Sequence, residues 1–154
     1  YNEDMVTVTT SASRLLRFLQ YAWAAPATAI GCFFAVFALC SGSTSRIVEG
    51  VIEVGGGRFA SVVRLLPRPM RFEAITFGHI ILGLNHRVLE THRLHEHLHV
   101  RQYERWGVLF FPLYIGSSLV QILRGRDPHS QNYFERQAYQ NAATNAPNTY
   151  HGCS

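Results

Sequence analysis

The chain contains two long stretches that are apolar and free of charged residues. The first covers residues 18–40 and the second covers residues 106–123. Because about 20 apolar residues in a helix can cross the hydrocarbon core of a bilayer, we predict a transmembrane helix over residues 18–41. Residues 1–17 form a polar N-terminal segment before it. A cleaved signal peptide and a buried helix of a soluble protein are the alternatives for this stretch.

The region between these stretches has the pattern of short β-strands. Residues 46–54 are rich in β-branched side chains and contain Gly50 at a turn position, which predicts a hairpin. Residues 74–82 predict a further strand, whereas residues 59–66 are compatible with a strand or a short helix. We therefore expect an α+β fold in which a small antiparallel sheet accompanies the helices.

A helix predicted to begin near residue 88 carries the sequence His95-Glu96-x-x-His99. On a helix, His95 and His99 lie one turn apart on the same face with Glu96 beside them, whereas His97 points nearly the opposite way. Two imidazoles at this spacing can bind one Zn²⁺, and a neighbouring carboxylate can take a proton from the attacking water. This is the H-E-x-x-H pattern of zinc metallopeptidases, although it also arises by chance in histidine-rich helices.

Beyond this motif, the sequence resembles a family of small, membrane-anchored, gluzincin-like zinc metallopeptidases of bacteria. Their motif helix reads H-E-x-x-H-V-R-Q-Y-E-R-W-G, which residues 95–107 match without a gap. A later N-P-F-E-R-E-A-Y segment of the family matches residues 132–139, except that Tyr133 replaces Pro and Gln137 replaces Glu. The resemblance covers most of residues 14–140.

The resemblance implies a zincin-like domain over residues 42–140, with Zn²⁺ as its cofactor. It also implies that Glu135 is the third zinc ligand beside His95 and His99. Three protein ligands leave the fourth position of a tetrahedral zinc open, which is the pattern of catalytic sites. The change at Gln137 removes a second carboxylate from this segment but leaves Glu135 in place.

The second apolar stretch is compatible with these ligands only if it does not cross the membrane. If residues 106–123 crossed, Glu135 would lie on the opposite side of the bilayer from the two histidines. Two glycines and a proline inside this stretch favour a bent or broken helix that returns to the same side. We therefore predict a bent, membrane-associated segment, followed by a Glu-bearing helix over residues 133–140 and a flexible tail over residues 141–154.

Charge and composition narrow the choice of partners. All fourteen basic residues are arginines, and the 154-residue chain has a formal net charge of +4. No run of arginines is interleaved with aromatic residues, so we expect membrane lipid and no nucleic acid as a partner. Two arginines precede residues 18–41 and five follow within the next 30 residues. The positive-inside tendency thus predicts a single-pass protein with its zincin-like domain on the cytoplasmic side, or on the stromal or matrix side of an organelle.

These features lead to two hypotheses about function. The first is a membrane-anchored peptidase in which Glu96 activates water for attack on a peptide substrate and His79 or Tyr103 contacts the transition state. A structural role is the alternative for His79 and for Tyr103. The second hypothesis is a non-catalytic, zinc-binding accessory subunit of a larger membrane complex, in which residues 18–41 and 106–123 pack on partner proteins.

Overall fold

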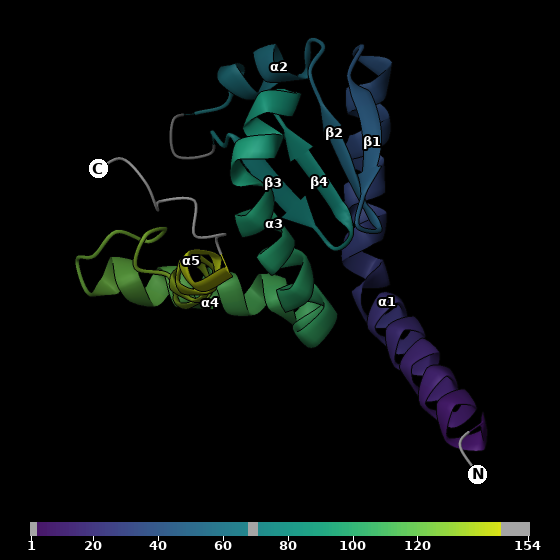
Figure 1. Cartoon of the computed structure of the whole chain (residues 1–154). Coiled ribbons are helices and arrows are strands. Elements are labelled where there is room, and N and C mark those ends of the chain that lie inside the picture. Colours follow the sequence, from purple (N-terminus) through teal and green to yellow (C-terminus); the bar gives the residue numbers. More distant parts are fainter. Residues whose placement is uncertain (1–2, 68–70, 146–154) are drawn as a thin grey trace, which may run out of the picture.

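The computed structural model describes residues 3–67 and 71–145, and Figure 1 shows their arrangement. In chain order the elements are α1 (Glu3–Cys40), β1 (Thr44–Val48), β2 (Val51–Gly55), α2 (Phe59–Leu65), β3 (Ala74–Phe77), β4 (Ile80–Gly83), α3 (His86–Trp106), the short 3-10 helix η2 (Gly107–Leu109), α4 (Phe110–Leu123) and α5 (Tyr133–Asn145). The α+β class and the order of helices and strands are confirmed, and the ambiguous segment 59–66 is the helix α2.

The sheet is mixed, where the sequence predicts an antiparallel one. Its strand order is β1-β2-β4-β3, with β1 antiparallel to β2 and β3 antiparallel to β4. The central pair, β2 and β4, is parallel. The reason is the connection through α2, which carries the chain past the position of β4 to the outer position of β3. As a result β3 is an edge strand, with one side of its backbone free of strand partners in the sheet.

Residues 74–82, predicted as one strand, form two strands joined by a tight turn. Gly78 lies in this turn with a φ of 58°, a conformation that glycine adopts at little energetic cost. The turn reverses the chain before Ile80, so that Phe77 pairs with Ile80. The alternation of side chains along residues 74–82 does not reveal this reversal, because both strands are apolar.

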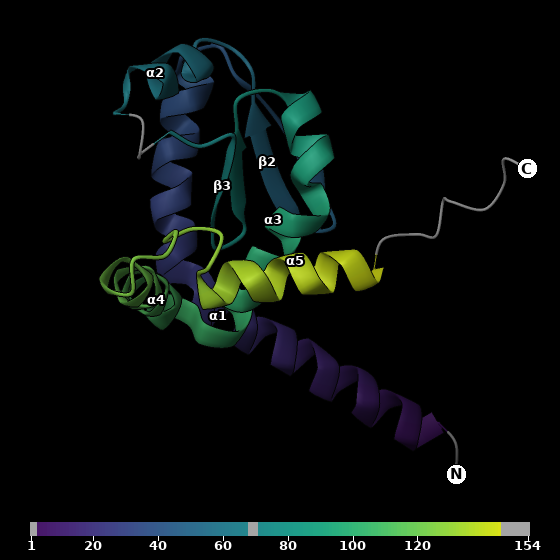
Figure 2. The ribbon, with the colours of Figure 1, turned by 90° about the vertical axis from the view of Figure 1, so that its left-hand side faces the viewer.

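The sheet lies between two helices. Figure 2 shows α1 along one face and α3 along the other. Each face has its own cluster of buried side chains. The cluster on the α1 side contains Ala35, Ala38, Val54, Phe59, Val63, Ile80 and Leu82, and the cluster on the α3 side contains Val51, Ile81, Leu89 and Val100.

Helix α1 turns its small residues toward the sheet and its large apolar residues outward. Its buried positions are Ala24 and Ala27, which pack with Tyr103, Phe110 and Phe134, and Gly31, Ala35 and Ala38, which pack on the sheet. They recur every three or four residues, which places them on one face of a helix. The opposite face exposes bulky apolar side chains, among them Phe33, Val36 and Phe37, with exposed fractions of 71%, 59% and 49%.

Two helical stretches are long and apolar enough to cross a membrane. They are residues Arg14–Cys40 and the region His86–Leu123, which includes α3, η2 and α4. α1 extends over residues predicted as a separate polar segment, and it contains Pro26. The predicted break in the second stretch is confirmed: α3 ends at Trp106, and the chain turns at Gly107 with a φ of 55°. Figure 1 shows α4 running across the lower end of α3.

The C-terminal helix is longer than predicted, because α5 continues to Asn145. The predicted tail over residues 141–154 is therefore helical as far as residue 145, and residues 146–154 lie outside the described residues.

Candidate metal centre

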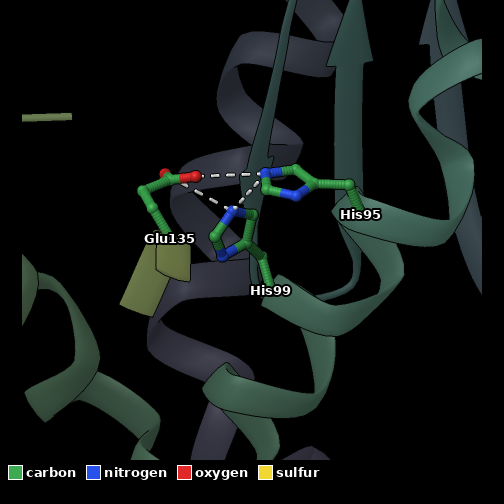
Figure 3. A group of neighbouring side chains, drawn as sticks. All are labelled: His95, His99 and Glu135. Atoms are coloured by element: carbon green, nitrogen blue, oxygen red, sulfur yellow. Dashed lines mark hydrogen bonds and ion pairs between the residues drawn. The ribbon is translucent and has the colours of Figure 1, made fainter. Parts of the chain in front are cut away.

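Three side chains from two distant segments converge at one point. His95 and His99 lie one turn apart on α3, and Glu135 lies in the first turn of α5. Figure 3 shows the three side chains pointing toward one another. The Nε2 atoms of the two histidines are 3.1 Å apart, His95 Nε2 is 3.1 Å from Glu135 Oε2, and His99 Nε2 is 3.5 Å from Glu135 Oε1.

The carboxylate reaches the histidines because α5 begins at a fixed point on α4. Asn132 is fully buried, and its side-chain oxygen accepts a hydrogen bond from the backbone N–H of Phe134, which caps the helix. Its amide group donates to the backbone oxygen of Tyr114 at 3.0 Å and to Ser118 Oγ at 2.8 Å. One asparagine therefore starts α5 and ties its first turn to α4, which sets the position of Glu135.

Gln102 orients His99 from behind. The Gln102 amide group donates to the backbone oxygen of Phe134 at 3.0 Å and to Gln137 Oε1 at 2.9 Å. These two acceptors fix the direction of the amide, so Gln102 Oε1 is the atom that faces His99 Nδ1 at 2.8 Å. In its neutral form His99 therefore carries its proton on Nδ1 and presents the lone pair of Nε2 to the centre.

The Glu135 carboxylate is ionised in this environment. Burial alone would raise its pKa, but the contacts with His95 and His99 and the hydrogen bond from Tyr114 outweigh burial and hold the pKa well below its ordinary range. Burial would also lower the pKa of His99, and the neighbouring Glu135 and Glu96 more than compensate and raise it. A cation that binds here therefore competes with a proton for His99, which makes its affinity dependent on pH.

These three residues fit a divalent cation such as Zn²⁺. With zinc–ligand bonds of about 2.0–2.1 Å, two ligand atoms of a tetrahedral site lie about 3.3 Å apart. The distances of 3.1 Å between the two Nε2 atoms and 3.1 Å from His95 Nε2 to Glu135 Oε2 are close to that value, and the three ligand atoms all lie within 4.8 Å of one another. Glu135 Oε2 is buried and accepts no hydrogen bond from any residue that the structure describes, although its side chain is only 4% exposed. The group could hold a metal ion with this oxygen and the two imidazole nitrogens as ligands.

A cavity of about 690 Å³ opens onto these ligands. Its walls come from β3 and the segment before it, from α3, from α4 and from the start of α5. Glu96 lines the cavity beside the histidines and is only 6% exposed. The hydroxyl group of Thr76, on the edge strand β3, donates to Glu96 Oε2 at 2.6 Å and so fixes the direction of this carboxylate.

The structure brings Tyr103 to this cavity but not His79. Tyr103 lines the cavity, is 2% exposed and packs on Phe110 with a ring distance of 4.3 Å; burial raises the pKa of its hydroxyl group. His79 stacks on Tyr21 with ring centroids 3.9 Å apart, and its Nε2 is 3.2 Å from Glu104. The turn at Gly78 directs His79 toward α1 and a second cavity, so the predicted contact of His79 with a transition state is wrong.

The other histidines of α3 are placed as the helical spacing predicts. His97 points away from the ligands and lies 3.5 Å from Glu49. His92 lies one turn before His95, pairs with Glu73 at 3.0 Å and lines the rim of the cavity. Sequence reasoning missed the roles of Thr76 and Tyr114, because nothing in the residues around either position marks a hydrogen bond to a distant carboxylate.

Comparisons of the chain with protein-family models, curated proteins and solved structures found no match. The resemblance to gluzincin-like peptidases therefore stays a prediction.

Proposed function

We propose that this protein is a membrane-bound zinc metallopeptidase of the gluzincin type. One observation carries the proposal: His95, His99 and Glu135 come from separate helices and lie within bonding distance of a single cation position. A histidine-rich helix that carries the H-E-x-x-H pattern by chance gives no reason for a buried carboxylate from another helix to meet it. It also gives no reason for Gln102 to fix the tautomer of His99.

The residues around the ligands have the roles that peptide hydrolysis requires. Zinc, when bound, would polarise a peptide carbonyl group and lower the pKa of the attacking water. Glu96 is positioned to take the proton of that water and to pass it to the leaving amine, and Thr76 is a positioning residue for Glu96. Tyr103 packs beneath the cavity. The edge strand β3 offers free backbone groups along the wall of the cavity, which suits an extended peptide that pairs with it.

The proposal includes association with a membrane. The two apolar helical stretches supply the surface for membrane lipid. The distribution of arginines along the chain supports a location of the domain on the cytoplasmic side, or on the stromal or matrix side of an organelle.

Metal analysis and two isosteric substitutions test the proposal. The purified protein is expected to bind about one zinc per chain and to hydrolyse peptides. Glu96→Gln should keep the zinc and lose hydrolysis, whereas Glu135→Gln should lose both. His97→Gln is the matched control, because it changes an imidazole of the same helix that points away from the ligands. Hydrolysis that survives in Glu96→Gln would remove this residue from the mechanism.

A second candidate function is a non-catalytic, zinc-binding accessory subunit of a larger membrane complex. The large apolar side chains exposed on α1 and α4 favour it, since partner proteins could cover them. This candidate predicts co-purification with membrane proteins in a fixed stoichiometry, no cleavage of any peptide, and unchanged assembly in Glu96→Gln.

A further inference from the structure

The arrangement of α1 is inconsistent with an ordinary membrane span. Residues 31–38 of α1 pack on the sheet, and Gly31 lies so close to β4 that an added Cβ atom would be 2.7 Å from Ile80 Cβ. If this part of α1 lies at a given depth in a bilayer, the sheet therefore lies at the same depth. If α1 stood upright in a bilayer with Gly31 near its centre, the sheet and α3 would lie at the same depth.

Charged residues of the sheet and α3 exclude that depth. Ile81, next to Ile80, pairs with Glu53 on β2, and Glu53 forms ion pairs with Arg46 and Arg93. Arg46 in turn contacts Glu90, whose side chain is 56% exposed. Each charged side chain at the centre of a bilayer costs at least about 2.5–3.5 kcal/mol, even on scales that give the lowest values. The upright orientation would place this whole network in hydrocarbon.

Many exposed apolar side chains nevertheless belong to three helices that lie on the same side of the molecule. Figure 2 shows α2, the C-terminal half of α1, and α4 together on the left, with α3 on the other side of the sheet. We define the outer apolar face by six exposed apolar side chains on these three helices. They are Phe33 and Phe37 on α1, Leu65 on α2, and Ile115, Leu119 and Leu123 on α4, with exposed fractions between 42% and 86%.

Charge around this face suits the surface of an anionic bilayer. Neither α2 nor α4 contains an acidic residue, and α1 contains none from residue 18 to residue 40. Arg64 on α2 and Arg124 and Arg126 after α4 are exposed and form no ion pair within the part of the chain that the structure describes. An amphipathic surface with bulky apolar residues inside a basic border binds in the plane of the headgroups, with its apolar side chains about 5–10 Å deep.

The same face adjoins the metal cavity. Phe111 of α4 lines the cavity and is 56% exposed, and Phe77 of β3 lines it while stacking on Phe34 of α1 at 5.6 Å. The wall of the cavity is thus formed in part by α4, and Phe77 in this wall contacts α1. A peptide that reaches the ligands from this side would pass along whatever covers α1 and α4.

We infer that the outer apolar face lies in one leaflet of an anionic bilayer, with α1 and α4 in the plane of the membrane, and that the metal cavity opens along the lipid surface. Its substrates are then polypeptide segments that lie at that surface. The statement about substrates rests on the proposed peptidase function. The statement about membrane geometry does not.

Depth measurements with spin labels test the geometry. In a variant with all cysteines replaced by serine, single cysteines at Ala29 and at the native Cys40 place labels on exposed positions of α1. After reconstitution into phosphatidylglycerol–phosphatidylcholine vesicles, both labels should report the same depth within about 5 Å. An upright helix would separate them by about 16 Å along the membrane normal, since they are eleven residues apart. A label at Thr91 on α3 is the control and should remain in water.

Binding to the vesicles supplies the second measurement. Phe33→Gln combined with Leu119→Gln should weaken binding by at least about tenfold, because each substitution removes apolar surface that lipid would cover. The control is Leu94→Gln, an exposed apolar residue on α3 on the other side of the sheet from α1, and it should bind as the unaltered protein does.

Each outcome of these experiments decides one statement. Label depths that differ by about 16 Å would overturn the membrane geometry, because they indicate an upright helix. Labels that stay in water, in a purified chain that forms oligomers, would also overturn it and would indicate that a protein covers this face. The statement about substrates predicts that a peptide tethered to lipid is cleaved faster than its untethered form. Equal cleavage of the two peptides would overturn that statement alone. Absence of any cleavage, with both labels at equal depth, would count against the proposed peptidase function and leave the membrane geometry intact.

Discussion

Gln102 connects the metal ligands to the folding of the C-terminal helix, and its substitution should separate these two roles. Its side chain makes three hydrogen bonds of 2.8 to 3.0 Å, one to His99 and two to α5, and the residue is only 6% exposed. Gln102→Leu removes all three. At about 1 kcal/mol for each hydrogen bond, with part of the polar atoms left buried without partners, the free energy of unfolding should fall by about 2–4 kcal/mol. Loss of the partner that orients a metal-binding histidine should also weaken zinc binding by about 10- to 100-fold.

Gln102→Glu is the matched variant. Its carboxylate can still accept the proton of His99 Nδ1, but it cannot donate to the backbone oxygen of Phe134 or to Gln137. We therefore expect lower stability with zinc affinity that is retained or increased. Urea denaturation of the metal-free protein measures the first quantity, and competition with a chromophoric chelator measures the second. If Gln102→Leu bound zinc as tightly as the unaltered protein, the argument that Gln102 fixes the tautomer of His99 would be wrong.

Four further predictions follow from other contacts. Tyr114→Phe removes the hydrogen bond to Glu135 Oε1 and should weaken zinc binding by a few tenths to about 1.5 kcal/mol, as measured by calorimetry. Gly31→Val places side-chain atoms against Ile80 and should lower the free energy of unfolding by about 1–3 kcal/mol, whereas Ala29→Val on the exposed side should not. Burial alone would raise the pKa of Glu53, but its hydrogen bonds with Arg93 and Arg46 outweigh burial and hold the pKa below the ordinary value of 4.5. The ionised carboxylate therefore stabilises the fold above pH 4.5, and this contribution should disappear as the pH falls further. Glu53→Gln should flatten this acid dependence in urea titrations at different pH values. Removal of bound zinc with a chelator should lower the melting temperature, by an amount that grows with the concentration of free zinc in the reference sample.

The sequence predicts those parts of the site that depend on positions within one helix. His95, Glu96 and His99 share a face because of helical geometry, and His97 points away for the same reason. These relations need no tertiary information. The predicted break after Trp106 also depends on a local cause, since a glycine with positive φ ends α3.

The pattern of residues along the chain does not predict contacts between distant segments. The hydrogen bond from Thr76 to Glu96 and the stacking of His79 on Tyr21 depend on which face of the sheet each side chain occupies. A turn at Gly78 reverses the chain in the middle of an apolar run, and this turn decides both placements. The parallel pairing of β2 with β4 has the same origin, because it arises only once residues 74–82 form two strands.

For residues 18–41, hydropathy alone does not distinguish a helix that crosses the bilayer from the in-plane helix that we propose. A window of apolar residues records the amount of apolar surface but not its distribution around the helix. In α1 the buried residues are small and the exposed ones are large, the reverse of what a helix in the core of a soluble protein requires. Small residues on the inner face allow the backbone of α1 to approach β4 closely, and the large residues remain available to lipid.

Helix α4 links the two proposals, because its opposite sides serve the metal centre and the outer apolar face. On one side, Tyr114 donates to Glu135, and Ser118 and the backbone oxygen of Tyr114 accept from Asn132. On the other side, Leu119 and Leu123 are exposed. A shift of α4 on lipid would therefore change the distance from Glu135 to the histidines, since α5 begins from α4. Zinc affinity measured with and without anionic vesicles should consequently differ in the unaltered protein. In the double variant Leu119→Gln and Leu123→Gln, the zinc affinity should be the same with and without vesicles. These substitutions weaken the contact of α4 with lipid but do not change the hydrogen bonds on its inner side.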